Sequence, residues 1–169
     1  MEIVVVLHNI RSTYNVGAIL RTMEGFGTKK ALFSGYTPVP HDKRLLPHLA
    51  DKLTRQIDKT ALGAGEFIEC RVVKSLQAEI AKLKKNGWLI VGLENNLNDP
   101  RLRQINNPEL KTQLRGQKIL LVLGEEVAGI SQELHQLIDW FLEIPMQGRK
   151  ESFNVSVATG IALYQLSLL

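Results

Sequence analysis

Three segments hold the residues whose types and spacing could do chemistry. Asn15-Val-Gly-Ala-Ile-Leu-Arg21 pairs an amide with a guanidinium, and Leu123-Gly-Glu-Glu-Val-Ala-Gly-Ile130 places two carboxylates after an apolar run. The third, Ile144-Pro-Met-Gln-Gly-Arg-Lys-Glu-Ser-Phe-Asn-Val-Ser-Val-Ala158, sets polar side chains at the entrance to an apolar helix. Arginine binds phosphate or carboxylate through its planar fork, and a helix N-terminus offers free amide donors. The chemistry indicated is therefore the binding of a polar or anionic ligand.

Each of these polar residues also has a plain structural interpretation. Ser152 and Asn154 are favoured helix-capping residues. Arg21 could pair with Glu24 or Glu126. Of the adjacent Glu125 and Glu126, we expect one to cap a helix or pair with a cation while the other is exposed, because neighbouring side chains diverge. From single segments, these structural roles are as strong as the functional ones.

Alternating apolar runs and helical patterns must position these groups. Continuous apolar runs predict strands, and apolar residues at helical spacing predict helices. The predicted strands are Ile3–Leu7, Lys30–Phe33, Phe67–Val73, Trp88–Leu93, Lys118–Leu123 and Trp140–Ile144. The predicted helices are Asn15–Phe26, Asp42–Leu62 (perturbed by Pro47), one capped by Ser75, a short one from Ser131, and Asn154–Leu168. This order indicates an α/β fold, a mostly parallel sheet with helices on both faces.

A parallel sheet binds ligands beyond the carboxyl ends of its strands. Three predicted strands end in polar loops, at Leu93-Glu-Asn-Asn, Leu123-Gly-Glu-Glu and Ile144-Pro-Met-Gln-Gly. The polar stretch Glu94–Gly116 is expected to be a loop, either a solvated connection or a contact with substrate. The last helix is apolar nearly all round, so a second copy of the chain is expected to cover part of it.

Composition narrows the possible functions. The length of 169 residues suggests a single domain, residues 1–169, and 44% hydrophobic residues are ordinary for a globular protein. A net charge of +4 favours a polyanionic partner such as nucleic acid, or is simply a basic surface. The single cysteine, Cys70, and four scattered histidines give no disulfide and no metal site. Phosphate-loop and dinucleotide fingerprints are absent, and no segment predicts a membrane span. The single cysteine fits a reducing cytoplasm, which is the expected location.

The three segments together closely resemble the motifs of the SpoU (TrmH-like) family of RNA ribose 2′-O-methyltransferases in the SPOUT superfamily. Asn15-x-Gly-x-x-x-Arg21 resembles the first motif, Leu123-Gly-Glu-Glu-x-x-Gly129 the second, and the segment from Ile144 to Ala158 the third. The resemblance spans essentially the whole chain, and the third motif is highly specific. It implies a C-terminal trefoil knot, a homodimer, and S-adenosylmethionine as the cofactor, bound in the knot.

The resemblance also assigns roles. Gly124, Ile144 and Phe153 would line the cofactor pocket, with Leu93 as a further candidate, and Gly148 would allow the knot loop a close approach. Arg21 would act at the ribose 2′-hydroxyl, and the polar motif residues would hold the geometry around it: Asn15, Glu126, Ser152 and Asn154. Because a guanidinium is a poor general base, Arg21 either has its basicity changed by its surroundings or grips a phosphate and stabilises alkoxide charge.

Two positions depart from the family pattern: Arg149-Lys-Glu makes the third motif unusually polar, and Phe153 stands where leucine is common. The expected substrate is RNA, with tRNA favoured over rRNA because no RNA-binding domain precedes the first strand. Basic residues of the catalytic domain would then bind it: Arg11, Lys43, Arg44, Lys52 and Arg55. The alternatives are a knotted methyltransferase that acts on a base nitrogen, an RNA-binding protein without catalysis, and a dimeric scaffold.

Overall fold

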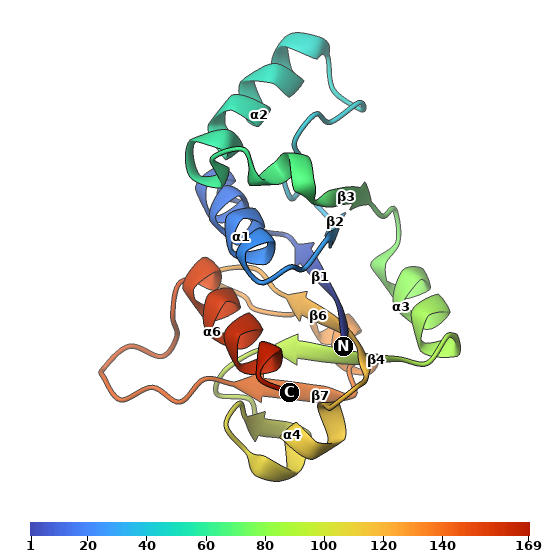
Figure 1. Ribbon diagram of the computed structural model, residues 1–169, viewed down its shortest axis with the longest axis vertical. Helices are drawn as coiled ribbons and strands as arrows, with labels where there is room; N and C mark the ends of the chain where they lie inside the picture. Colours follow the sequence, from blue (N-terminus) through green and yellow to red (C-terminus); the bar gives the residue numbers. More distant parts are fainter.

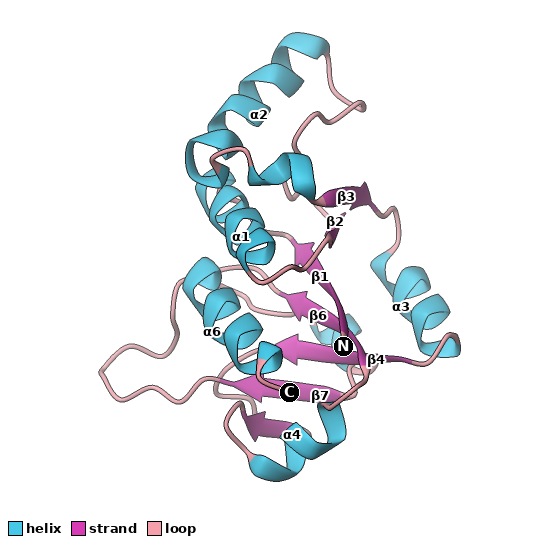
Figure 2. Ribbon diagram, viewed as in Figure 1, coloured by secondary structure: helices cyan, strands magenta, loops and turns pink.

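The computed structural model describes all 169 residues, and a seven-stranded parallel sheet is its central layer. Figure 1 shows the strands stacked through the middle of the molecule with helices around them, and Figure 2 separates the two classes by colour. The order across the sheet is β3-β2-β1-β6-β4-β7-β5, and every pairing is parallel. The strands are β1 (Glu2–His8), β2 (Lys30–Ser34), β3 (Glu69–Val72), β4 (Trp88–Leu93), β5 (Leu102–Gln104), β6 (Lys118–Leu123) and β7 (Trp140–Glu143).

Helices cover both faces of this sheet. They are α1 (Thr13–Gly25), α2 (Pro47–Ala61), α3 (Leu76–Lys85), α4 (Pro108–Leu114), α5 (Gln132–His135) and α6 (Val155–Ser167), with a short 3-10 helix, η1 (Ala64–Phe67). Successive residues of β1 alternate between two buried clusters: Val5 and Leu7 join the cluster on the side of α1 and α6, whereas Val4 and Val6 join the one beside α3 and α5. The predicted α/β class is confirmed.

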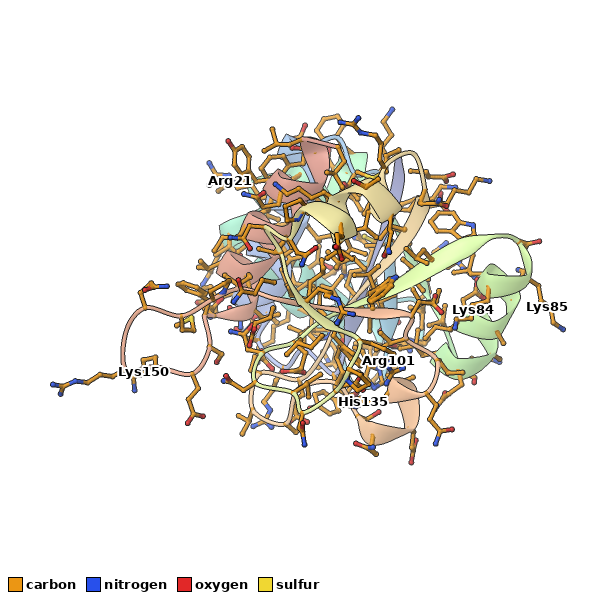
Figure 3. All side chains as sticks on the ribbon, turned by 90° about the horizontal axis from the view of Figure 1, so that it is seen from below. Arg21, Lys84, Lys85, Arg101, His135 and Lys150 are labelled. Atoms are coloured by element: carbon orange, nitrogen blue, oxygen red, sulfur yellow. The ribbon has the colours of Figure 1, made fainter.

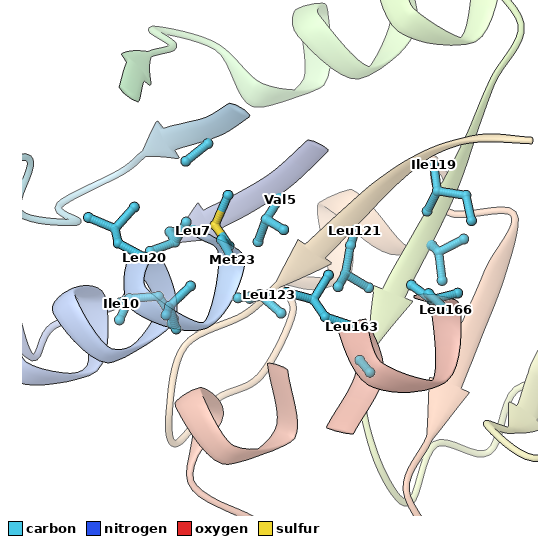
Figure 4. Close-up of a cluster of buried hydrophobic side chains, with 14 of the residues drawn as sticks. Val5, Leu7, Ile10, Leu20, Met23, Ile119, Leu121, Leu123, Leu163 and Leu166 are labelled. Atoms are coloured by element: carbon cyan, nitrogen blue, oxygen red, sulfur yellow. The ribbon is translucent and has the colours of Figure 1, made fainter. Parts of the chain in front are cut away.

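The larger cluster holds α1 and α6 against the sheet. Leu20 and Met23 of α1, together with Leu163 and Leu166 of α6, are all buried over β1 and β6, as Figure 4 shows. Gly17 lets α2 pack against the other side of α1, since a Cβ there would lie 2.2 Å from the Ile57 carbonyl oxygen. The glycine of the first motif is thus explained by helix packing.

The segment Glu94–Gly116 corrects the sequence analysis. The prediction of a loop throughout is wrong, because it contains β5 and α4. Asn107 caps α4 by accepting from the Leu110 N–H at 2.9 Å, Pro108 fills the first turn, and Leu110 and Leu114 are buried one turn apart. Asn-Pro followed by this spacing is a helix signal that the polar composition obscured.

Pro47 is likewise better described as a helix start than as a perturbation. Helix α2 begins at Pro47, where the missing N–H costs no hydrogen bond, so the prediction of a helix from Asp42 is wrong at its N-terminal end. The prediction at Ser75 is confirmed: its side chain accepts from the Ala78 N–H at 3.2 Å and begins α3. The trefoil knot stays a prediction from the resemblance.

Candidate active site

A pocket of about 360 Å³ lies at the carboxyl ends of three neighbouring strands, β4, β6 and β7. It is where a parallel sheet is expected to bind a ligand. All three polar loops predicted from the sequence contribute to it, and the N-terminus of α6 closes it. Its lining consists of Leu93, Glu94, Asn95, Leu123, Gly124, Glu125, Glu126, Val127, Gly129, Ile144, Ser152, Phe153, Asn154, Val155 and Ala158.

Two glycines of the second motif shape the wall after β6. Glu125 and Gly129 exchange two backbone hydrogen bonds of 2.9 Å, which close the loop on itself. A Cβ on Gly124 would lie 2.3 Å from the Gly129 carbonyl carbon, so only glycine lets this loop fold back. A Cβ on Gly129, whose φ is +69°, would lie 2.2 Å from Glu94 Oε2, which accepts from the Ile130 N–H at 2.8 Å. Both glycines therefore make room for protein atoms of the loop.

Asn95 ties the loop after β4 to the loop after β7. Its Oδ1 accepts from the Ile144 N–H at 3.0 Å, and its Nδ2 donates to the Ile144 carbonyl at 2.9 Å. The amide thus pairs with a backbone unit as a neighbouring strand would. Sequence reasoning missed both Glu94 and Asn95 as site residues, and their position directly after a buried strand was the available signal.

A chain of hydrogen bonds joins one residue from each motif at the rim of the pocket. Asn15 Nδ2 donates to Glu126 Oε1 at 3.1 Å, and Asn154 Nδ2 donates to Asn15 Oδ1 at 3.1 Å. Asn154 Oδ1 in turn accepts from the Ser156 N–H at 2.9 Å and caps α6. A carboxylate only accepts and a backbone N–H only donates, so both amides have their orientation fixed from the two ends of the chain.

Glu126 also holds the backbone in front of α1. Its carboxylate accepts from the Arg11 N–H at 3.2 Å and from the Ser12 N–H at 3.4 Å. Burial would raise the pKa of Glu126, but hydrogen bonds from these N–H groups and from Asn15 outweigh it and keep the pKa below its ordinary value. Glu126 is thus an ionised acceptor at neutral pH. Glu125 instead pairs with Arg11 at 3.3 Å. Of the two adjacent carboxylates, Glu125 is therefore the one that pairs with a cation, and Glu126 is the one that accepts from backbone N–H groups at a helix start.

The structure gathers most of the predicted cofactor residues. Leu93, Gly124, Ile144 and Phe153 all line the pocket, as does Ser152. Phe153 is 40% exposed and forms an apolar wall. Ser152 makes no hydrogen bond within the chain, although its neighbour Asn154 is fully engaged.

Three predicted residues are not part of the pocket lining: Asn15, which lies at the rim, and Gly148 and Arg21, which lie further away. Gly148 belongs to a loop that projects from the molecule before α6 (Figure 1), and a Cβ on it would meet no atom within 4 Å. Arg21 is exposed on α1. Figure 3 shows the side chain of Arg21 on the outer surface, and also that of Lys150 in the projecting loop. The expected pairing of Arg21 with Glu24 or Glu126 does not occur. Helix geometry sets Arg21 about 9 Å along α1 from Asn15 and about 120° around it.

None of the helices has both the length and the apolar composition that crossing a bilayer requires. No three histidine, cysteine or carboxylate side chains gather where they could hold a metal ion.

Residues 2–164 match the sequence model of the SpoU rRNA Methylase family. The 23S rRNA (guanosine-2'-O-)-methyltransferase RlmB of Pseudomonas aeruginosa is 30% identical over 166 residues, which are 98% of this chain and 58% of that relative. This chain therefore spans somewhat more than half the length of such curated relatives.

Solved structures show the same fold. The A. aeolicus TrmH/SpoU tRNA modifying enzyme aligns with a TM-score of 0.76 at 23% identity, over 99% of this chain and 74% of that one. An AdoMet-bound rRNA methyltransferase from Sinorhizobium meliloti aligns with a TM-score of 0.75 at 22% identity, over 98% of this chain and 55% of that one.

Proposed function

The chain belongs to the SpoU rRNA methylase family, and from this premise we propose that it methylates a ribose 2′-hydroxyl in RNA with S-adenosylmethionine. One observation carries the proposal: side chains of three separated motifs meet at one pocket and are joined there by hydrogen bonds through Glu126, Asn15 and Asn154. Such an arrangement exceeds what helix capping alone requires, because Asn15 lies within α1 and still bridges two loops.

The pocket suits the proposed cofactor in size and lining. Its volume of about 360 Å³ lies within the range of sites for molecules of this size. Leu93, Ile144 and Phe153 supply apolar walls for an adenine ring, and the Glu94 carboxylate lies in the same lining as a partner for a cationic group. S-Adenosylmethionine, when bound, supplies an electrophilic methyl group on a sulfonium.

The residues of this chain would then bind and align the ribose. With the cofactor bound, the 2′-oxygen would accept its methyl group in place of the hydroxyl proton, which would leave to solvent, and the cofactor would be left as a thioether. Ser152, with its free hydroxyl at the pocket, would contact the substrate, while Asn15, Glu126 and Asn154 act as positioning residues. Alignment of the oxygen with the methyl group would carry much of the rate.

Arg21 would reach a site only in a dimer, as part of this proposal. Arg21 is exposed on α1 seven residues after Tyr14, so the two lie on the same side of that helix. Helices α1 and α6 lie side by side (Figure 1) and share an exposed face with large apolar side chains. Those side chains are between 39% and 56% exposed: Tyr14, Phe26, Val157, Tyr164 and Leu168. A second copy of the chain is the partner that we propose for this face, because a two-fold axis buries one apolar patch against itself.

In that dimer, Arg21 of one chain would serve the pocket of its partner. The guanidinium, a permanent cation, would hold an RNA phosphate and stabilise negative charge on the 2′-oxygen. This role needs no proton transfer to or from arginine.

The RNA substrate would be tRNA or rRNA. The 2′-hydroxyl itself distinguishes RNA from DNA. The names of similar proteins include both classes of RNA. A cytoplasmic location is part of the proposal, since tRNA and rRNA are found there.

The test is to incubate the purified protein with methyl-labelled S-adenosylmethionine and separate pools of unmodified tRNA and rRNA. Digestion to nucleosides and mass spectrometry should find a 2′-O-methylated nucleoside in one pool. Gly124→Ala, which disturbs the pocket wall, should abolish it, whereas the matched surface variant Lys85→Ala on α3 should not. Label on a base would refute ribose methylation, and absence of cofactor binding would refute the enzyme altogether.

A further inference from the structure

A second pocket of about 360 Å³ lies beside the candidate active site, at the carboxyl ends of β1 and β2. It is formed by the start of α1, the loop after β2 and helix α2. Its lining is Arg11, Thr13, Gly35, Tyr36, Thr37, Pro38, Asp42, Arg44, Leu45 and Leu53. Neither the motifs nor the proposed transfer assigns this pocket a role.

Tyr36 is an exposed aromatic side chain on a firmly held loop. Its residue is 52% exposed, yet both neighbours are fixed. Gly35 has a φ of +63°, and a Cβ on it would lie 1.7 Å from Asn9 Oδ1, which accepts from the Tyr36 N–H at 3.4 Å. On the other side, Thr37 Oγ1 donates to the Leu7 carbonyl at 3.0 Å and accepts from the Ile10 N–H at 3.1 Å. These contacts fix the backbone on both sides of Tyr36, whose side chain lines the pocket.

Two arginines line the same pocket as Tyr36 and have N–H donors without a partner. The Arg44 side chain is 53% exposed and binds Asp42 through Nε and Nη2, at 2.8 Å and 2.7 Å, which leaves Nη1 without a partner. The Arg11 side chain is 76% exposed and holds Glu125 through Nη2 alone. Both guanidiniums are thus positioned by a carboxylate and keep N–H groups that can donate to a phosphate.

Arg11 also connects this pocket to the active site. Its backbone N–H donates to Glu126 Oε2 at 3.2 Å, and Glu126 lines the first pocket. The two pockets are therefore separated by the width of one loop, so that consecutive nucleotides of one strand could occupy both.

We infer that this second pocket, which Tyr36 lines, binds the nucleotide next to the one that is methylated, in a single-stranded stretch of RNA. The base would stack on Tyr36, and its phosphate would be held by Arg11 and Arg44. A base offers a flat π-face and a phosphate offers charge, which matches an exposed ring between two guanidiniums. This inference rests on the proposed function, because it takes RNA as the substrate.

The experiment measures binding of a fluorescein-labelled, unstructured RNA of about 12 nucleotides by anisotropy, with S-adenosylmethionine binding measured in parallel. Tyr36→Ala should weaken RNA binding about 5- to 150-fold, the range for loss of one base stack. Tyr36→Phe should stay within about twofold, because it keeps the ring. Phe67→Ala is the matched control, since Phe67 is an aromatic residue in η1 that is even more accessible, at 69% exposed, and lies outside the pocket.

Salt dependence separates the phosphate contacts from stacking. Arg44→Ala should reduce the slope of log K against log salt by about 0.7, the value for one phosphate on a single strand, whereas Tyr36→Ala should leave the slope unchanged. RNA carrying 4-thiouridine should cross-link to the tryptic peptide of residues 31–43, which contains Tyr36.

The outcomes distinguish the inference from the function on which it rests. If the wild-type chain methylates RNA and Tyr36→Ala binds RNA as tightly as Phe67→Ala does, the inference is wrong and the function stands. If the wild-type chain binds S-adenosylmethionine but neither binds nor methylates RNA, the proposed function fails and the inference with it. Unchanged cofactor binding by every variant shows that a loss of RNA binding is not a loss of fold.

Discussion

Two inactive variants of this chain should restore activity to each other when they share a dimer. Arg21→Ala removes an exposed cation from α1 and touches no residue of the pocket. Gly124→Ala would place its Cβ 2.3 Å from the Gly129 carbonyl carbon, so the Gly129–Ile130 backbone and with it the pocket wall must move. Neither substitution alters the apolar side chains of the exposed face on α1 and α6, so both variants should be able to form the proposed dimer.

The size of the effect follows from two-fold symmetry. If each site combines one chain's pocket with Arg21 of the other, the mixed dimer contains one site with an intact pocket and an intact Arg21. Its second site lacks both. A purified mixed dimer should therefore show about half the activity of the wild-type dimer, and an unsorted equal mixture about one quarter, because about half of its dimers are mixed.

The assay is methyl transfer to RNA by mixed dimers isolated through two different affinity tags. The control pairs a wild-type chain with a chain that carries both substitutions. Sites completed across the interface make this control inactive, whereas sites contained in one chain make it about half active and leave the first mixed dimer inactive. The second pattern would refute the argument that Arg21 acts on the partner's pocket.

Further predictions concern single side chains. Asn15→Asp places a second carboxylate against Glu126, and the like charges raise the pKa of the pair. Activity should therefore fall about tenfold or more at pH 8 and recover partly toward pH 6, where a protonated carboxyl group can again donate a hydrogen bond. The activity of Asn15→Ala should show no such recovery. The pKa of Glu126 is lower in the folded state than its unfolded-state value near 4.5. Its ionised form therefore stabilises the fold above that pH, and this contribution is lost as the pH falls through the folded-state pKa. The melting temperatures of Glu126→Gln and the wild-type protein should therefore converge in acid. Ser152→Ala should lower methyl transfer and leave the free energy of unfolding within about 0.5 kcal/mol of wild type, because Ser152 makes no hydrogen bond in the chain. Burial raises the pKa of the Cys70 thiol to about 11, so alkylation by iodoacetamide at pH 8 should be slow in the native protein and fast in urea, and rapid native labelling would contradict that burial.

The central strands could be predicted from the sequence because each is a continuous apolar run. Trp88–Leu93 and Lys118–Leu123 match β4 and β6 to the residue, and both lie inside the sheet. Strand β5 was missed because it has only three residues, lies at the sheet edge and is not fully buried, so no apolar pattern marks it. Edge strands depend on a neighbour that the local sequence does not reveal.

The candidate site also combines features that the local sequence marks with features that depend on distant segments. Polar loops after three strands were predicted to meet, since the carboxyl ends of parallel strands share one edge. The roles of Glu94 and Asn95 were missed because each binds backbone atoms of a distant segment, at Ile130 and at Ile144. Backbone N–H and C=O groups belong to every residue type except proline, which lacks the N–H. When a side chain bonds to them, the sequence therefore contains no complementary side chain that would reveal the contact.

The polar motif residues divide according to whether the fold already occupies their hydrogen-bonding groups. Asn15, Glu126 and Asn154 hold one another and two helix starts, so their removal should cost both stability and activity. Arg21 and Ser152 contact no polar group of the chain, and nothing in the fold explains an arginine or a serine at those positions. Members of the first set also hold the backbone at two helix starts, so substitutions there cannot separate a structural role from a functional one. Side chains with free donors are available to a substrate, and the clearest test of catalysis is therefore to replace Arg21 and Ser152, the two residues whose loss should change the reaction and leave the fold intact.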